Sequence, residues 1–174
     1  NVSHFSAADH LGEELRSVGI QSSTVPMPGP KIRMDVTPLP KQLSAITYIP
    51  EGREDFYGLS WVIRLAEDNQ DAEFRIVAHS GRGVSAPGNM KFLGWVTPQM
   101  MRELYIGSTC VLRLTAHDVL ASTVLEGVSH GRYAIWTYPA PYAYCVRSYS
   151  DLSDAFGQVR RHQEPNTHWA EYVA

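Results

Sequence analysis

Two acidic residues, Asp118 and Glu126, stand on either side of a short stretch that contains hydroxyl side chains. Apolar residues recur at helical spacing from Ala121 to Val128, which predicts a helix that begins near Ala121. The first N–H groups of a helix have no partner inside it and carry partial positive charge, which suits a phosphate. Carboxylates accept hydrogen bonds from sugar hydroxyls. The spacing therefore indicates a site for phosphate and sugar together, as in a nucleotide-sugar.

The same residues also fit a purely structural interpretation. Thr123 and Glu126 have the spacing of a capping box, in which the threonine caps the helix and the glutamate reaches back to the backbone. Asp118 would then be an ordinary loop residue. On the other hand, Ser122, Glu126 and Ser129 would share one helix face, distinct from the apolar one. The residues alone leave both interpretations open.

The elements around this stretch predict how it is held. Residues 110–137 read as strand, loop, helix and strand, the order of a βαβ unit with parallel strands. Ligands of such sheets gather where the strands end and the helices begin. The whole chain predicts strands over 43–49, 73–78, 90–93, 110–114, 133–137 and 144–146, and helices over 3–18, 56–65, 97–105, 121–128, 152–159 and 166–173. This alternation predicts an α/β fold with a doubly wound, mostly parallel sheet, Rossmann-like in type.

The proline distribution suggests two parts. Five prolines between Pro26 and Pro40 exclude a regular element across that segment. We expect residues 1–41 to form an N-terminal helix, capped by Ser3 or Ser6, and a proline-rich interdomain linker. Residues 42–174 would form one Rossmann-like nucleotide-sugar-binding domain, in which Ser150 or Asp151 caps the helix over 152–159.

Composition narrows the class of protein. The chain has 174 residues, of which 44% are hydrophobic and 19% are charged, as in ordinary globular domains. Its formal charge of −3 gives no reason to expect a nucleic-acid partner. The two cysteines lie in β-prone runs and fit buried thiols in a reducing, cytoplasmic compartment. Because the chain begins with Asn1, we expect it to be a fragment of a longer protein.

The acid pair and its surroundings resemble the signature of the retaining glycosyltransferases of GT-B architecture, the glycosyl transferase group 1 family. That signature is Glu, seven residues, Glu, then Ala-x-Ala-x-Gly-x-Pro-Val. Asp118 takes the place of the first acid, one methylene shorter, and Glu126 that of the second. Gly131 and Ala134-Ile135 take the places of the glycine and of Pro-Val, and Gly127 replaces the usual alanine. The resemblance implies a single donor-binding half of a GT-B architecture.

The resemblance also assigns roles. In the family the first acid contacts the transferred sugar, the second holds the ribose hydroxyls, and the loop amides between them hold the diphosphate. The sugar role falls on Asp118, with His117 added as a possible donor to sugar or phosphate. The ribose role falls on Glu126, and the diphosphate role on Leu120, Ala121, Ser122 and Thr123.

Two further segments match the family more loosely. Gly52-Arg53 matches a Gly-Arg pair whose arginine grips the donor phosphates, although a solvated loop arginine is the alternative. Tyr57-Gly58 stands where Lys-Gly is expected, so the lysine is missing. The strand over 90–93 resembles one whose following backbone meets the nucleobase, which places Gly94, Trp95 and Val96 beside the base. Trp95 either stacks on the base or packs as a strand-end aromatic.

Together these features lead to a donor-binding domain of a retaining glycosyltransferase in polysaccharide biosynthesis. It would transfer a hexosyl group from a UDP- or GDP-sugar to a sugar, lipid or polysaccharide acceptor, with no cofactor and no metal. Acceptor recognition, and any peripheral contact with a membrane, would belong to a missing N-terminal domain, so this fragment alone is expected to be inactive. The alternatives are a non-catalytic Rossmann-like domain that binds a nucleotide or a partner, and a sugar-nucleotide epimerase-like domain.

Overall fold

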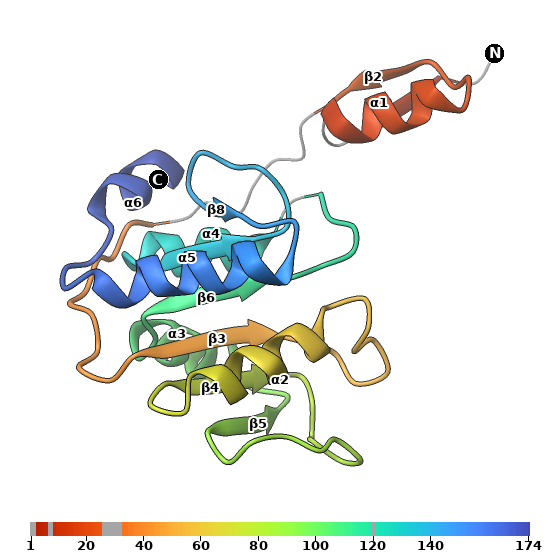
Figure 1. The fold of residues 1–174 in the computed structure, drawn as a ribbon. Coiled ribbons are helices and arrows are strands. Elements are labelled where there is room, and N and C mark those ends of the chain that lie inside the picture. Colours follow the sequence, from red (N-terminus) through yellow and green to blue (C-terminus); the bar gives the residue numbers. More distant parts are fainter. Residues whose placement is uncertain (1–2, 7–8, 26–32, 120) are drawn as a thin grey trace.

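The computed structural model describes residues 3–6, 9–25, 33–119 and 121–174. Its main feature is a six-stranded, all-parallel sheet in the order β5-β4-β3-β6-β7-β8 (Figure 1). The strands are β3 (Ser44–Tyr48), β4 (Glu73–Val77), β5 (Met90–Gly94), β6 (Cys110–Arg113), β7 (Tyr133–Trp136) and β8 (Tyr144–Cys145). The helices are α2 (Leu59–Asp68), α3 (Pro98–Ile106), α4 (Ser122–Ser129), α5 (Tyr149–Arg161) and α6 (Thr167–Val173). The predicted doubly wound α/β fold is confirmed.

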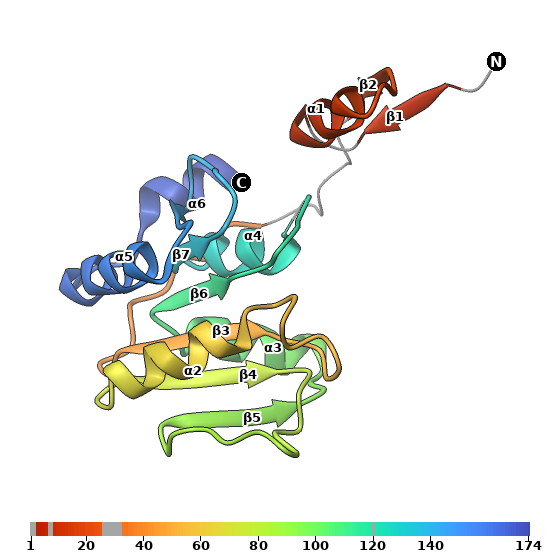
Figure 2. The same ribbon diagram turned by 45° about the vertical axis from the view of Figure 1, so that its right-hand side comes forward.

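Helices cover both faces of this sheet, which explains why its central strands read as continuous apolar runs. In Figures 1 and 2, α2 and α5 lie on one face and α3 and α4 on the other. On the first face the rings of Phe74 and Phe156 stack with centroids 5.5 Å apart. On the second face Tyr105 of α3 packs with Ile46 and Val111. The sheet is therefore a buried layer, and a ligand has access to its strand ends.

The strand order reverses next to the central strand. From β3 the chain moves outward to β4 and β5, and then returns to the other side of β3 to form β6 and β7. In open α/β sheets, this switch point opens a crevice at the carboxyl ends of the strands. The start of α4, which follows β6, lies at that edge.

The beginning of the chain differs from the prediction of one helix over 3–18. It forms a separate parallel unit of β1 (His4–Ser6), α1 (Asp9–Ser17) and β2 (Ser22–Thr24). Ser6 lies in a strand, so its predicted role as a helix cap is wrong, and Ser3 precedes that strand. After the end of α1, Gly19 adopts a φ of 83°, a conformation typical of a residue that ends a helix. Pairing with a strand 18 residues away overrode the local helical pattern.

The proline-rich segment is described from residue 33 onward, and residues 26–32 lie outside the described residues. Residues 33–42 form no helix or strand, as expected. Part of this segment lies against the C-terminal end of α4. The N–H of Asp35 donates to the carbonyl of Ser129 at 3.0 Å, and that of Thr37 to the carbonyl of His130 at 3.3 Å. The fully buried guanidinium of Arg132 donates to the carbonyls of Pro38, Ile106 and Ser108. This extended strip, residues 33–38, is thereby fixed to the large sheet unit.

Two helix starts were predicted inaccurately. α5 begins after Ser148, whose hydroxyl accepts from the N–H of Asp151 at 3.1 Å, while the Asp151 carboxylate accepts from the N–H of Ser148 at 2.9 Å. This capping box replaces the predicted caps at Ser150 or Asp151. α2 begins at Leu59, later than predicted, after a turn at Gly58.

None of the described helices combines the length and apolar character needed to cross a lipid bilayer.

Candidate functional site

A cleft of about 930 Å³ opens between α3 and α4 beside the ends of β3, β4 and β5. Its size is that of a small-molecule site. Tyr48 and Val77 form its floor at the strand ends, and the extended strip contributes Arg33 to Asp35 on one side. The cleft therefore lies at the crevice that the strand order predicts.

Five predicted binding residues line this cleft together. Ser122, Thr123 and Glu126 come from α4, and Trp95 and Val96 come from the segment that follows β5. Ser122 and Glu126 belong to the polar face that the sequence predicted, and Ser129, the third residue of that face, also lines the cleft. The structure thus brings the predicted ribose, diphosphate and base contacts to one place, and their roles toward a ligand stay predictions.

The start of α4 is open toward the cleft. Ala121 is the N-cap residue and is buried, and its carbonyl accepts from the N–H groups of Val124 and Leu125 at 2.9 and 3.1 Å. Within the described residues, no side chain caps this helix. Thr123 lies inside the helix, so the capping-box interpretation of Thr123 and Glu126 is wrong. Leu120, the first predicted diphosphate contact, lies outside the described residues.

Asp118 has a different environment. Its side chain is buried and accepts from the guanidinium of Arg113 at 2.7 and 3.3 Å, from Thr115 Oγ1 at 3.1 Å and from Trp136 Nε1 at 3.3 Å. The N–H of Val119 adds a bond of 2.9 Å. Burial alone would raise the pKa of Asp118, but the hydrogen bond and charge of Arg113 outweigh burial and lower it. Asp118 is not among the residues that line the cleft.

The other predicted residues also lie outside the cleft lining. His117 is exposed, with Nε2 2.9 Å from a Glu14 carboxylate oxygen of α1. Arg53 is exposed in the loop after β3, at the same edge of the sheet as the cleft. Gly94 ends β5 with a φ of 62°, and its N–H donates to the carbonyl of His79 at 3.0 Å. The diphosphate and sugar contacts proposed for His117 and Arg53 remain untested by this geometry.

Trp95 is available to a ligand. Its side chain is 78% exposed, which the packing interpretation does not predict. Its ring meets the ring of Tyr48 edge to face at 6.1 Å, so one aromatic neighbour orients it. An exposed indole beside a cleft offers a flat apolar face to a planar ring such as a nucleobase.

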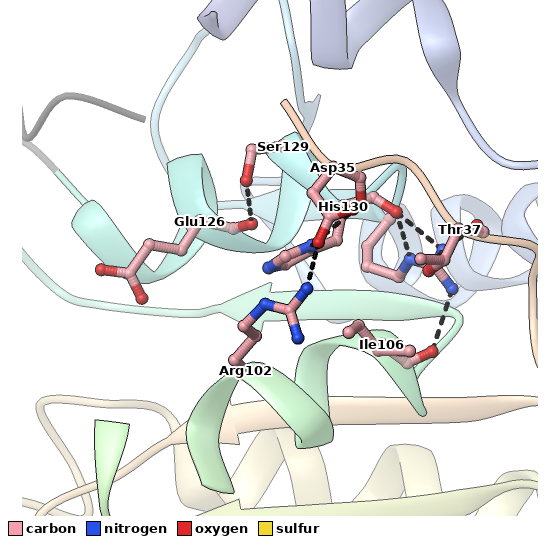
Figure 3. Close-up of polar contacts among 8 residues, drawn as sticks. Asp35, Thr37, Arg102, Ile106, Glu126, Ser129 and His130 are labelled. Atoms are coloured by element: carbon pink, nitrogen blue, oxygen red, sulfur yellow. Dashed lines mark hydrogen bonds and ion pairs between the residues drawn. The ribbon is translucent and has the colours of Figure 1, made fainter. Parts of the chain in front are cut away.

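Sequence reasoning missed the residues that close the far end of the cleft. Figure 3 shows Arg102 of α3 pointing toward Asp35 of the extended strip, next to His130 at the end of α4. Arg102 and Asp35 form an ion pair, and His130 Nδ1 lies 3.0 Å from the Asp35 carbonyl oxygen. These partners are distant in the chain, so no local pattern could have revealed them. Tyr105 of α3 also lines the cleft.

Tyr57 occupies the position where the resembling family carries a lysine. Its ring lies under the guanidinium of Arg113, with 5.0 Å from Cζ to the ring centroid, and meets Tyr48 edge to face at 6.0 Å. The adjacent Gly58 has a φ of 67°, and a Cβ there would lie 2.7 Å from the carbonyl oxygen of Leu114. The turn therefore requires glycine at position 58. At position 57, an aromatic ring replaces the lysine ammonium of the resembling family.

A second cleft of about 890 Å³ lies over the ends of β6 and β7, where Trp61, Trp136 and Thr115 contribute to its wall. None of the predicted site residues that the structure describes lines this second cleft. Among the described residues, no three His, Cys, Asp or Glu side chains gather in a way that could hold a metal ion.

Comparison with known proteins gives a match in structure. No family model matches the chain, and no curated protein sequence matches it. The S. aureus TarM in complex with Fondaparinux, alpha-GlcNAc-glycerol and UDP matches 98% of the chain with a TM-score of 0.75 and 8% identity. Sucrose-phosphate synthase from Thermosynechococcus elongatus matches 97% with a TM-score of 0.74 and 10% identity. The chain has the fold of one half of a GT-B glycosyltransferase.

A third match extends this finding. The pneumococcal O-GlcNAc transferase GtfA in complex with UDP and GlcNAc covers 97% of the chain with a TM-score of 0.67 and 13% identity. The chain spans 39% of that TarM, 52% of the synthase and 41% of GtfA. The predicted GT-B half is therefore confirmed as a fold, whereas the identities are too low to transfer chemistry.

Proposed function

We propose that this chain is the donor-binding domain of a retaining GT-B glycosyltransferase and holds a nucleoside-diphosphate sugar in the cleft between α3 and α4. One observation carries the proposal. Glu126 and the exposed Trp95, which are 31 positions apart, line one cleft beside a helix start that no side chain of the described residues caps. A carboxylate for hydroxyls, an aromatic face for a base and free N–H groups for phosphate are the three kinds of group that a nucleotide needs.

The order of these groups fits the order of a nucleotide. The N–H groups at Ser122 and Thr123 would bind the diphosphate at the positive end of α4. Glu126 follows one helical turn later and would accept bonds from the two ribose hydroxyls. Trp95 and Val96 lie on the opposite side of the cleft and would meet the base. UDP and GDP are both consistent with this arrangement.

The sugar end relies on residues outside the cleft lining. His117 and Asp118 are the proposed contacts of a transferred hexose, and Arg53 would stabilise the charge that builds on the leaving diphosphate. For Asp118 this role requires its carboxylate to exchange a bond from Arg113 or Thr115 for one from a sugar hydroxyl. The proposal invokes no metal ion. Acceptor binding and transfer would need a further domain.

Two neighbours support the substrate class. The TarM and GtfA structures contain UDP, and that of GtfA also contains GlcNAc. Those ligands belong to those proteins. For the present chain, the shared fold makes a nucleotide-sugar the class of ligand to test first.

A second candidate is a non-catalytic nucleotide-binding domain of the same fold. The hydrogen bonds that occupy Asp118 and the presence of Tyr57 in place of a lysine favour it. In that case the nucleotide would bind through Glu126, and no group would grip the sugar. Both candidates therefore bind the nucleotide, but only the glycosyltransferase domain also binds the sugar.

Calorimetric titration with UDP, GDP and their sugars tests the proposal. We expect the wild type to bind at least one of them, and Glu126→Ala to weaken that affinity by about tenfold or more, as expected for lost bonds to a charged group. Glu103→Ala is the matched control, because Glu103 is an exposed acid of α3 outside the cleft lining. Absence of binding to any of these nucleotides would contradict the proposal. A sugar that adds no affinity to its nucleotide would favour the non-catalytic candidate.

A further inference from the structure

The side chain of Tyr105 carries a buried polar group that lies beside the cleft. Tyr105 is 1% exposed and lines the cleft from α3, facing α4. Within the described residues, its buried hydroxyl has no hydrogen-bond partner of good geometry. A buried hydroxyl without a partner is costly, so native structures retain one where something else uses it.

The ring of Tyr105 is held rigidly, so the direction of its hydroxyl is set. It packs against Ile46 and Val111 of the sheet and stacks on the His130 ring with centroids 6.3 Å apart. α4 approaches this ring at Gly127, where an added Cβ would lie 3.5 Å from Tyr105 Cδ1 and would overlap Val111 Cγ2. Glycine at this position, where the resembling family has alanine, lets α4 lie close to the tyrosine.

Glu126 precedes Gly127 in α4, and its carboxylate influences the pKa of the Tyr105 hydroxyl. Burial raises the pKa of Tyr105 most, and the nearby charge of Glu126 and a hydrogen-bonding interaction with its side chain raise it further. The hydroxyl therefore keeps its proton and can donate, while the Glu126 carboxylate is an acceptor with several lone pairs. A carboxylate that accepts one bond from a fixed donor has fewer orientations available when it meets a ligand.

We propose that Tyr105 is a positioning residue, whose hydroxyl orients the Glu126 carboxylate toward the two ribose hydroxyls and so makes the cleft selective for ribonucleotides over 2′-deoxynucleotides. This inference rests on the proposed function, because it requires a nucleotide in the cleft with its ribose at Glu126. Arg102 is a weaker candidate for this positioning role, since its guanidinium is already paired with Asp35.

The test compares UDP with 2′-deoxy-UDP by calorimetry, or GDP with 2′-deoxy-GDP if the wild type binds GDP more tightly. We expect the wild type to prefer the ribonucleotide by about tenfold, and Tyr105→Phe to reduce that preference to about threefold or less, mainly by weakening ribonucleotide binding. A preference that Tyr105→Phe leaves at the wild-type value would overturn the inference.

A second tyrosine provides the matched control. Tyr133 is also buried, but its hydroxyl donates to the Glu164 carbonyl at 3.2 Å, and it does not line the cleft. Tyr133→Phe should lower the melting temperature and leave the ribose preference unchanged. Tyr105→Phe should reduce the ribose preference and leave the melting temperature near the wild-type value, because within the described residues the buried hydroxyl makes no well-formed hydrogen bond that would be lost. A Tyr105→Phe chain that fails to fold would therefore contradict the inference.

A double-mutant cycle links the effect to Glu126. In a Glu126→Gln background, Tyr105→Phe should produce no further loss of preference, because the acceptor that it orients is already changed. Independent, additive losses would contradict a role through Glu126. A wild type that binds no nucleotide would defeat the proposed function itself. A wild type that binds nucleotides without regard to the 2′-hydroxyl would leave that function standing and overturn only the inference.

Discussion

Asp118 and Glu126 carry the same charge and flank the same short segment, yet the fold gives them opposite environments. Asp118 accepts hydrogen bonds from Arg113, Thr115 and Trp136 in the interior beside β6 and β7. Glu126 is half-buried on α4 and lines an open cleft with Ser122. Sequence spacing alone ranks the two acids equally. The structure separates an acid that pairs with a largely buried cation from an acid that faces an open cleft.

The cause of the difference is the position of a cation. Arg113 ends β6 and its side chain is only 13% exposed, so its charge needs a partner within the protein. The loop after β6 turns Asp118 back onto it. Glu126 follows the start of α4 and lies on the polar side of that helix, where no such requirement acts. The three predictions below test whether this distinction between the two acids is real.

The largest expected effect concerns removal of each acid. Asp118→Ala should lower the free energy of unfolding by about 3–5 kcal/mol, because it leaves a buried guanidinium without its counterion. Glu126→Ala should lower it by less than about 1 kcal/mol, as for a replacement at a partly exposed site. Urea denaturation followed by circular dichroism measures both. Equal losses would remove the distinction between the two acids.

A paired substitution provides the control for that result. Replacing both partners, with Asp118→Leu and Arg113→Met together, should restore part of the stability lost in Asp118→Ala, because no unpaired charge is left behind. A double variant that is less stable than Asp118→Ala would show that the loss in Asp118→Ala does not come from an uncompensated Arg113.

A smaller effect is expected for the glycine that places Glu126. Gly127→Ala should lower the unfolding free energy by about 1–3 kcal/mol, because the new methyl group overlaps Val111 and forces α4 outward. Gly157 of α5 is the matched helical glycine with nothing within 4 Å of an added Cβ. Gly157→Ala should raise stability by up to about 1 kcal/mol. If both variants change stability in the same direction, the close approach of α4 to the sheet is not what holds Glu126 in place.

The smallest effect is the pH dependence of stability that Asp118 contributes. Because the pKa of Asp118 is lowered in the folded state, its contribution to stability is present above its unfolded pKa of about 3.9 and is lost as pH falls through the folded value. Stability of the wild type should therefore fall more steeply below about pH 4 than that of Asp118→Asn. Denaturant titrations from neutral to acidic pH measure how the free energy of unfolding depends on pH. The same dependence in Asp118→Asn and the wild type would contradict the prediction.

The sequence was sufficient for the large sheet, for a clear physical reason. Its central strands are covered on both faces, so runs such as Cys110 to Leu112 in β6 are continuously apolar and easily recognised. Helical periodicity likewise placed Ser122, Glu126 and Ser129 on one face, and all three line the cleft. A strand run or a helical period lies within one chain segment, so it can be recognised from that segment alone.

The contacts that the sequence could not predict join residues that are far apart in the chain or that a loop brings together. The ion pair of Arg102 and Asp35 joins residues 67 positions apart. The bond between Arg113 and Asp118 depends on how one loop turns, and the strand at His4–Ser6 depends on pairing with Ser22–Thr24. Such contacts are properties of the assembled fold, so the role of Asp118 in the interior became visible only in the structure.

A crystal structure with UDP or GDP bound tests the account most directly. The account predicts a ribose within hydrogen-bond distance of Glu126, a diphosphate at the first N–H groups of α4 and a base against Trp95. A nucleotide bound instead in the second cleft beside Trp61 and Trp136, or one whose ribose does not contact Glu126, would contradict it.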